Sequence, residues 1–400
     1  KFSMPAENSK NQNNVVATRW IYDPKVRGII FQAVAVACVA WMLFYFISNA
    51  LHNMETRGIA TGFAFLDNRA SFGIAQTLIS YSEDDTYGRA FIIGLLNTLL
   101  VSAIGIVFAT ALGFVVGIAR LSKNWLLSRA AAVYIETFRN IPLLLQIFFW
   151  YFCVLRNLPA PRQSMSLGDA FFLNVRGLSI PAPVIESGFS FVVGAFIVAI
   201  IAIVVLRKWA KKRQYLTGQI FPVFYSSLGL LIGLPLLTFL FSGMPLHWEL
   251  PELKGFNFRG GFTIIPELFS LAVALTIFTA ASIAEIVRSG IMSVSKGQVE
   301  AASALGLRGG LTLRFVIIPQ AMRVIIPPLT SQFLNLVKNS SLATAVGYPD
   351  LVSVFMGSTL NQTGQAVEII AMTMAVYLTI SLITSALMNM YNAKNALVER

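Results

Sequence analysis

Long apolar runs separated by shorter polar segments make up most of the chain. Eight of these runs are long enough to cross a bilayer as a helix, which takes about 20 residues. Short segments of alternating apolar and polar residues, which a transmembrane barrel requires, do not recur along the sequence. The pattern therefore predicts an all-α integral membrane protein with about eight transmembrane helices.

The apolar runs divide the chain into tails, spans and loops. We expect a tail at 1–28, a first span at 29–50, a loop at 51–88, spans two and three within 89–155 (the third at about 130–155), a loop at 156–187, spans four and five within 188–241, a loop at 242–264, spans six to eight within 265–390 and a tail at 391–400. No cleavable signal peptide is expected, because the mostly polar first tail keeps the apolar run away from the start. In span two, Gly105, Gly113 and Gly117 offer small surfaces for close helix packing.

Lysine and arginine are concentrated on one side of this topology. Of the 30 Lys and Arg residues, 20 lie on the side that holds both termini and 8 lie on the other. Because cytoplasmic loops are rich in these residues, both termini are predicted to be cytoplasmic. The same distribution explains the net charge of +12 without a nucleic-acid partner. The 12% of charged residues, against roughly 25% in soluble domains, again indicates the lipid bilayer as the surroundings.

Residue patterns that carry bond-making chemistry are not found. The sequence has no carboxylate pair, Ser/His/Asp set or Cys/His cluster at catalytic spacing. His52 and His247 are far apart, so a metal site is not expected. Cys38 and Cys153 lie in apolar runs and are expected to be packing residues without a disulfide. We therefore predict that the chain is not an enzyme.

A charged segment, Val294–Arg323, lies between spans six and seven on the side predicted to be cytoplasmic. Residues 294–307 are predicted to form a short helix that Ser295 caps and that Gly309 and Gly310 end. Several of its residues are small, so a partner could approach the helix closely; they are Ala301, Ala302, Ala304 and Gly306. From these residues alone, it is either a helix that docks in another protein or a connector lying on the surface.

The same segment resembles the EAA motif of ABC-importer permeases. That pattern is Glu-Ala-Ala, three residues, Gly, nine residues and Ile-x-Leu-Pro. Here it reads Glu300-Ala301-Ala302, Gly306 and Val316-Ile317-Ile318-Pro319, with two conservative apolar exchanges. Further blocks at 97–122, 136–152, 279–291 and 338–351 are similar to the polar amino-acid permease family. The variant Arg139–Pro142 (RNIP), the extra first span and the insertion of spans four and five are most similar to the Q-type permease subunit of general L-amino-acid ABC transporters.

The resemblance implies a five-span type I ABC importer core with three extra spans, in a bacterial inner membrane. Its function would be ATP-driven import of L-amino acids by alternating access. The implied partners are a homologous second permease, two ATP-binding subunits and a periplasmic amino-acid-binding protein. The chain has no Gly-x4-Gly-Lys-Ser/Thr loop, so ATP and Mg would be bound by the partner ATPase. The coupling helix would be about 295–308, and the coupling residues would be Glu300, Ala301, Ala302, Gly306 and Pro319.

One polar turn stands inside span seven. Lys338-Asn339-Ser340-Ser341 interrupts an apolar stretch, and a charge in lipid usually faces a cavity or a partner. The turn could be unwound along the amino-acid pathway, with the ammonium of Lys338 binding the α-carboxylate. It could instead be a structural polar bend, or Lys338 could extend to the headgroups.

Other polar residues in or near the spans have two interpretations each. Gln146 and Asn335 either contact substrate or bond neighbouring helices. Glu136 with Arg139, and Glu285 with Arg288, are three residues apart near the cytoplasmic ends of spans three and six. We expect ion pairs of a cytoplasmic gate there rather than substrate contacts.

Two rival functions belong to other classes. An ion-coupled secondary amino-acid transporter would need a coupling residue near the bilayer midplane, and apart from Lys338 the spans offer no buried Asp or Glu. A membrane scaffold without transport predicts no polar turn along a pathway. Neither rival explains the EAA-like segment as well as an importer permease does.

Overall fold

The computed structural model describes residues 24–56, 58 and 61–395. Most of the predicted N-terminal tail and the end of the C-terminal tail lie outside the described residues. Seven described helical segments are long and apolar enough to cross a membrane, or eight if one bent pair forms a span. The predicted helical membrane fold with about eight spans is therefore confirmed, although short strands occur in the loops. The long helices are α1 (Pro24–Thr56), α2 (Tyr87–Arg120), α5 (Phe189–Thr217), α6 (Val223–Phe241), α7 (Pro266–Met292), α10 (Ile318–Asn339) and α12 (Ala366–Asn395).

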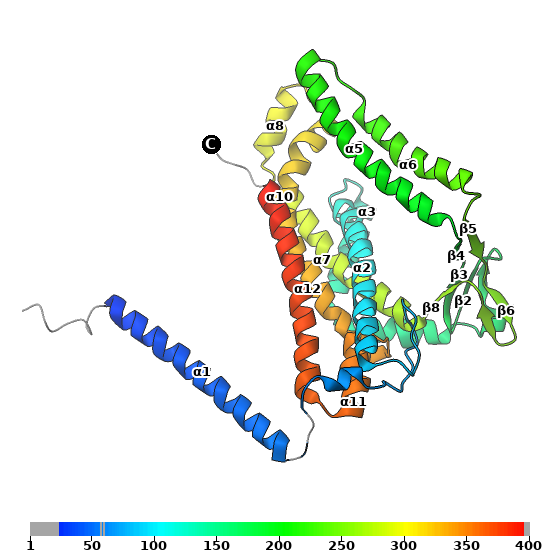
Figure 1. Cartoon of the computed structure of the whole chain (residues 1–400). Helices are drawn as coiled ribbons and strands as arrows, with labels where there is room; N and C mark the ends of the chain where they lie inside the picture. The colour runs from blue at the N-terminus through cyan, green and yellow to red at the C-terminus, as the bar shows by residue number, and fades with distance from the viewer. Residues whose placement is uncertain (1–23, 57, 59–60, 396–400) are drawn as a thin grey trace, which may run out of the picture.

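The core is a bundle in which α2, α7, α10 and α12 pack together (Figure 1). Small residues on α2 let its backbone approach α7. A Cβ atom added at Gly117 would lie 2.7 Å from the carbonyl oxygen of Ala284. The predicted small surfaces at Gly105, Gly113 and Gly117 are thus confirmed as helix contacts: Gly105 lies against Leu336 and the other two lie against α7. This close packing is the usual way in which helices associate in lipid.

Span three is not the single straight span that was predicted. Helix α3 (Trp125–Asn140) meets the segment Leu143–Asn157 at an angle of 105°, and that segment consists of α4 (Leu143–Phe148), the π-helix η3 (Phe149–Val154) and the 3-10 helix η4 (Leu155–Asn157). Pro142 explains the bend, because it lacks an N–H and forces Ile141 into an extended conformation with φ −89° and ψ 126°. The apolar run continues through the bend, so hydropathy alone could not reveal it.

The loops at 156–187 and 242–264 fold into short antiparallel strands that were not predicted. One sheet has the strand order β1-β2-β3-β8. Strand β4 pairs with β5, and β6 pairs with β7, as two separate two-stranded sheets. The strands are β1 (Met165–Leu167), β2 (Phe171–Asn174), β3 (Gly177–Ile180), β4 (Ala182–Ile185), β5 (Leu246–Glu249), β6 (Glu252–Lys254), β7 (Asn257–Arg259) and β8 (Phe262–Ile264), with η5 (Pro161–Gln163) before them. At three or four residues each, they are too short to show an alternating pattern.

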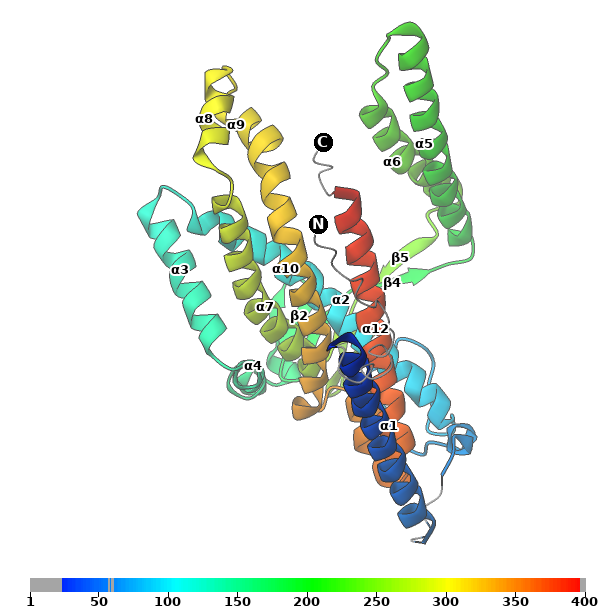
Figure 2. The ribbon, with the colours of Figure 1, turned by 90° about the vertical axis from the view of Figure 1, so that its left-hand side faces the viewer.

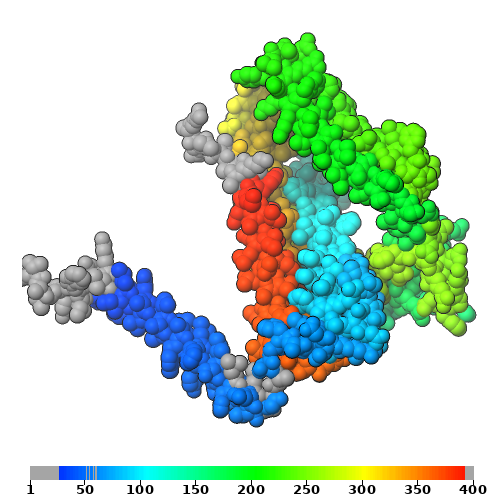
Figure 3. All heavy atoms as spheres, in the orientation of Figure 1, coloured from blue at the N-terminus to red at the C-terminus, as the bar shows by residue number. Residues whose placement is uncertain are grey.

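Helices α5 and α6 pack on each other and stand apart from the core (Figures 1 and 2). We call this helix pair the arm. Figure 3 shows an opening between part of the arm and the core. The arm begins after β4 and ends before β5, where His247 Nδ1 lies 2.9 Å from Glu186 Oε1. Cys38 on α1 and Cys153 on η3 are free and exposed, so they are not the interior packing residues that were expected.

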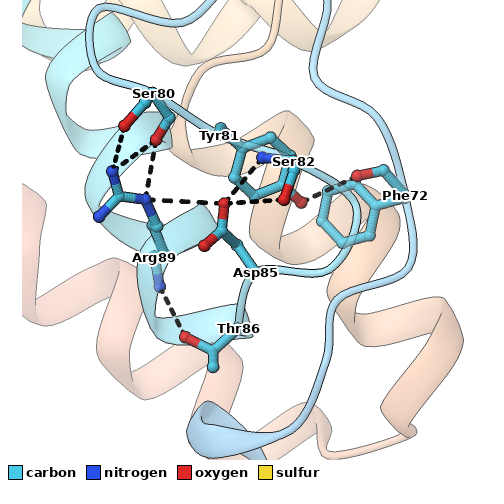
Figure 4. Close-up of polar contacts among 7 residues, drawn as sticks. All are labelled: Phe72, Ser80, Tyr81, Ser82, Asp85, Thr86 and Arg89. Carbon is cyan, nitrogen blue, oxygen red and sulfur yellow. Dashed lines mark hydrogen bonds and ion pairs between the residues drawn. The ribbon is translucent and has the colours of Figure 1, made fainter.

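The loop before α2 is held firmly over the start of that helix (Figure 4). It contains the 3-10 helix η2 (Ala64–Asp67). Arg89 donates to the Ser80 carbonyl oxygen at 2.8 Å, and its own N–H donates to the capping hydroxyl of Thr86 at 3.3 Å. Burial, and then the carboxylates of Asp85 and Glu83, raise the pKa of Tyr81 in this loop. The loop is therefore a packed cap on the bundle.

Candidate functional site

The short helix predicted at 294–307 is present as α8 (Lys296–Ala304), but its end differs from the prediction. Ser295 occupies the N-cap position, but its side chain makes no capping hydrogen bond. The helix ends at Ala304, before the predicted Gly309 and Gly310, because the chain turns at Gly306, which has a φ of +73°. Gly309 instead begins the next short helix, α9 (Gly309–Thr312).

The end of α8 is a Schellman motif. The N–H of Leu307 donates to the carbonyl oxygen of Ala302 at 3.1 Å, and the N–H of Gly306 donates to that of Ser303 at 2.9 Å. This pair of bonds requires a left-handed residue at the position of Gly306, where glycine has no Cβ penalty. The motif's glycine therefore has a clear backbone role: it ends the helix and turns the chain toward α9.

The surface of α8 is almost entirely exposed. Glu300 and Ala301 face away from the chain, and only Ala302 is buried within it. Leu305, at the turn, is 81% exposed. A small-residue helix that presents a bare leucine beyond the ends of α7 and α10 has the shape expected for docking in a cleft of another protein.

Pro319, the last residue of the EAA-like pattern, lies at the start of α10. A π-helix, η6 (Leu313–Ile317), immediately precedes that helix. Since proline has no N–H, the chain cannot continue the regular α-helical bonding through this position. Pro319 therefore lies at an irregular junction between the segment that contains α8 and the span α10.

An exposed polar stripe runs along α10. At about 100° per residue, four polar residues fall on the same side of the helix as the exposed Val324 and Pro328. They are Ser331, Gln332, Asn335 and Lys338. Gln332 is half-buried and the other three are exposed. In a span, such a stripe cannot face lipid at low cost, so it must be covered by another subunit or line an aqueous space.

The stripe ends at the polar turn that was singled out from the sequence. The α-helix stops at Asn339, and Ser340–Val346 continue as the 3-10 helix η7. Ser340 and Ser341 donate to the carbonyl oxygens of Val337 and Lys338, both at 2.7 Å. Their hydroxyls thus stabilise the tightened turn. Within the described part of the chain, Lys338 has no ion pair.

A second polar feature lies nearer to α8. A cavity of about 230 Å³ is formed where α3, α7 and α10 meet, and its lining includes Arg139, Ser282, Glu285, Ser289, Pro328 and Gln332. It brings together two residues predicted for a cytoplasmic gate, Arg139 and Glu285, with Gln332 of the stripe. Ser282, Ser289 and Gln332 were not predicted; their spacing at helical intervals was the signal that could have found them.

The two predicted ion pairs differ. Glu285 and Arg288 form a bidentate pair, with Nε donating to Oε2 at 2.9 Å and Nη2 donating to Oε1 at 2.5 Å. Glu136 and Arg139 make no ion pair among the described contacts, and both are exposed. Arg139 instead lines the cavity beside Glu285.

Gln146 closes the bend in span three. Its Nε2 donates to the carbonyl oxygens of Phe138 and Ile141, at 3.0 and 2.9 Å. These are carbonyl groups that the break at Pro142 leaves without a complete set of helical partners. Gln146 is only 4% exposed, so its position favours the interhelical alternative over direct substrate contact.

Asp350, between α10 and α12, lies in a buried junction that was not predicted. Asp350 is fully buried; its Oδ1 accepts the Ser353 N–H at 2.8 Å and its Oδ2 accepts the Tyr377 hydroxyl at 3.2 Å. It thereby begins the π-helix η8 (Val352–Thr359), which leads to α11 (Leu360–Thr363). On the other side, Asn97 Nδ2 of α2 donates to the Pro349 carbonyl at 2.9 Å. The junction fixes the segment after the polar turn to α2 and α12.

Comparisons with known proteins show similarity to membrane components of transport systems. A family model described as binding-protein-dependent transport system inner membrane component matches residues 192–396. The chain is 56% identical over 392 residues to the putative amino-acid ABC transporter permease protein YhdX of Escherichia coli (strain K12), covering 98% of this chain and 100% of the relative. It is 50% identical to the general L-amino acid transport system permease protein AapQ of Rhizobium johnstonii, with 95% of each chain covered.

More distant similarity was also found. The chain is 44% identical to the glutamate/glutamine/aspartate/asparagine transport system permease protein BztB of Rhodobacter capsulatus, over 95% of this chain and 96% of the relative. A solved structure described as an amino acid ABC transporter with histidines aligns with a TM-score of 0.46 at 20% identity, covering 77% of this chain and 95% of that one. At that TM-score the likeness carries no argument.

Proposed function

Because the chain belongs to the family of binding-protein-dependent transport system inner membrane components, as an amino-acid ABC transporter permease, we propose that it forms one half of the pathway of an ATP-driven L-amino-acid importer. It is a multi-pass inner-membrane protein and a transporter subunit, not an enzyme. Family members work with a partner ATPase and a binding protein. Similarity to ABC permeases gives no support to the ion-coupled alternative.

The observation that carries the proposal is the polar stripe on α10. Ser331, Asn335 and Lys338 are exposed on a helix that lies in the membrane. The described part of the chain leaves these three side chains uncovered, and lipid would be an unfavourable neighbour for them. We infer that a homologous second permease stands opposite, and that the stripe lines the space between the two.

We infer that α8 docks in one of two ATP-binding subunits, which hold ATP and Mg. Both termini and α8 would then be cytoplasmic. Leu305 and the exposed faces of Glu300 and Ala301 would enter a cleft of the ATPase. Closure of the ATPase dimer would move α8, and this movement would be transmitted to α10 through the junction at Pro319. The spans would then alternate between outward and inward access.

The substrate class, amino acids, is inferred from the chemistry of the exposed side chains as well as from the relatives' names. A free ammonium group at Lys338 suits the α-carboxylate that all amino acids share, and the amide groups of Asn335 and Asn339 suit its other polar atoms. The cavity beside Arg139 and Glu285 would receive the substrate on the inward side. A periplasmic binding protein would deliver the amino acid at the end that carries the strands.

Accessibility measurements test the proposal in the assembled complex. Single cysteines would replace Asn335 or, as a control, Leu382, which is 60% exposed on α12; Cys38 and Cys153 would first be changed to alanine. We expect a membrane-impermeant thiol reagent to label the Asn335→Cys position, and bound amino acid to slow that labelling. The Leu382→Cys position should stay unlabelled in lipid. Equal inertness of both positions would show that the stripe does not border an aqueous route.

A further inference from the structure

The helix α5 continues well beyond its apolar stretch. After Leu206, the last eleven residues of the helix carry five cations, Arg207, Lys208, Lys211, Lys212 and Arg213. The whole arm, residues 189–241, contains no Asp or Glu. None of the five cations forms an ion pair with any described residue. The end of the arm is therefore a concentrated positive charge that has no acidic partner among the described residues.

Four of the five cations share one face. At about 100° per residue, Arg207, Lys208, Lys211 and Lys212 fall within an arc of about 140°, and all four are exposed. The buried residue nearby, Ala210, lies on the opposite side, where α5 packs on α6. The cations thus point away from the arm's own contact.

Arg213 is different from these four. Its Nη2 donates to Gln219 Oε1 at 2.8 Å, and its guanidinium lies 5.4 Å from the ring centroid of Trp209. Arg213 therefore stabilises the turn at the tip of the arm and does not belong to the face formed by the other four cations.

The same face continues along α5 as an apolar stripe. Ile197, Ile200, Ile201 and Val204 fall within the arc of the cations and are 53%, 44%, 58% and 49% exposed. Trp209 and Tyr215, exposed at the cationic end, are the residue types that lie at membrane interfaces. One continuous face therefore presents a cationic end and an apolar length, on a helix that packs on α6 and stands apart from the core helices (Figure 2).

We propose that this face is a binding site for an anionic phospholipid. The phosphate lies among Arg207, Lys208, Lys211 and Lys212, and the acyl chains lie along Ile197, Ile201 and Val204. Clusters of four or more Lys and Arg next to a span are the chemistry that anionic headgroups select. A soluble acidic protein could reach the cations but not the apolar stripe below them, whereas a lipid matches both.

The site differs from the coupling site in position. The tip of the arm lies at the same end of the molecule as α8, but the two are well separated in Figure 2. Lipid bound to the arm would thus hold its tip at the membrane surface without occupying the face of α8 that is proposed to dock in the ATPase.

Quenching of Trp209 fluorescence by brominated lipids tests the site in the full complex reconstituted into bilayers. The fluorescence of Trp209 is obtained as the difference between the wild-type complex and the Trp209→Phe complex. We expect brominated phosphatidylglycerol to quench it at least twice as strongly as brominated phosphatidylcholine at the same mole fraction. The preference should vanish in a variant with all four cations changed to Gln, and it should weaken at high salt in the unmodified protein. A control variant neutralises four cations of the strand region instead, Arg162, Arg176, Lys254 and Arg259, and should keep the preference.

Two results would overturn the site. One is equal quenching by both lipids in the wild type at low salt, which needs no variant and so does not depend on folding. The other is a four-cation variant that keeps its lipid preference; if it also loses the ATP-binding subunit in gel filtration, the face docks a protein instead.

Discussion

Gly113 of α2 lies directly against Ile283 of α7. A Cβ atom added at Gly113 would lie 2.6 Å from Cγ2 of Ile283 and 3.1 Å from the carbonyl oxygen of Ala280. Real carbon atoms do not come that close, so the absence of a side chain at Gly113 sets the distance between the two helices. Since Ile283 is fully buried, there is no room for it to move aside.

The first prediction concerns this contact. Gly113→Ala should separate α2 from α7 and lower the free energy of unfolding by about 1–3 kcal/mol, the usual cost of overpacking. Gly194→Ala, in the exposed α5, is the matched control, because an added Cβ atom there would meet no described atom of another element within 4 Å. It should be neutral or stabilise slightly, because alanine favours a helix over glycine. Thermal unfolding of both variants in detergent checks this, and equal melting temperatures would contradict the tight contact.

A second prediction concerns the end of the coupling helix. Gly306→Val places a β-branched residue at a φ of +73°, which costs about 1–2 kcal/mol, and the Schellman bonds should break. We expect the complex to assemble but amino-acid uptake and substrate-stimulated ATPase activity to fall about tenfold or more. Gly310→Val is the control, because Gly310 has no positive φ and no neighbour within 4 Å. If both variants transport normally, the shape of the α8 terminus does not matter for coupling.

The sequence predicted the membrane spans because an apolar run of about 20 residues indicates a transmembrane helix. It also located α8, since a helix rich in small residues between two spans is a local pattern. It missed the bend at Pro142, where apolar residues continue on both sides and hydropathy does not change. It missed the strands as well, because their stability comes from pairing between segments such as Leu178 and Ile264, which are far apart in sequence.

The polar stripe was half found. Asn335 and Lys338 stand out as polar residues among apolar neighbours, whereas Gln332 becomes meaningful only when α10 is read at helical intervals. The burial of Asp350 was not predicted, because the preceding Gly347 and Pro349 are residue types typical of a loop. Its burial depends on α2 and α12, and only the tertiary structure brings those helices to it.

A third prediction uses the ion pair of α7. The side chains of Glu285 and Arg288 are each 29% exposed, so solvent screens the pair only in part. Glu285→Gln and Arg288→Gln should each lower stability, and the double variant should recover part of the loss. We expect a coupling energy of about 1–2 kcal/mol from a double-mutant cycle on thermal unfolding. Strictly additive losses would mean that the two charges act independently.

A fourth prediction concerns the buried carboxylate of Asp350. Asp350→Asn removes an acceptor from the Ser353 N–H or the Tyr377 hydroxyl, and leaving a buried group unpaired costs about 1–3 kcal/mol. Asp84→Asn is the control, because Asp84 pairs with Arg69 at an exposed site, where such pairs contribute about 0–1 kcal/mol. Unfolding midpoints in denaturant should therefore fall clearly for the first variant and hardly for the second. The reverse order would refute a structural role for the junction.

The last prediction separates the three interpretations of Lys338. If its ammonium binds the α-carboxylate in the pathway, Lys338→Ala should raise the KM for many amino acids by a similar factor, about tenfold for the loss of one charged hydrogen bond. Lys338→Arg should retain most of the uptake, because the charge remains. If Lys338 only extends to the headgroups, both variants should transport normally and Lys338→Ala should change only the yield of protein in the membrane. If the turn is a structural bend, Ser340→Ala should impair folding more than Lys338→Ala does, since Ser340 is fully buried and donates to Val337. Initial uptake rates in proteoliposomes for an acidic, a basic and a neutral amino acid, together with thermal unfolding of each variant, distinguish these outcomes.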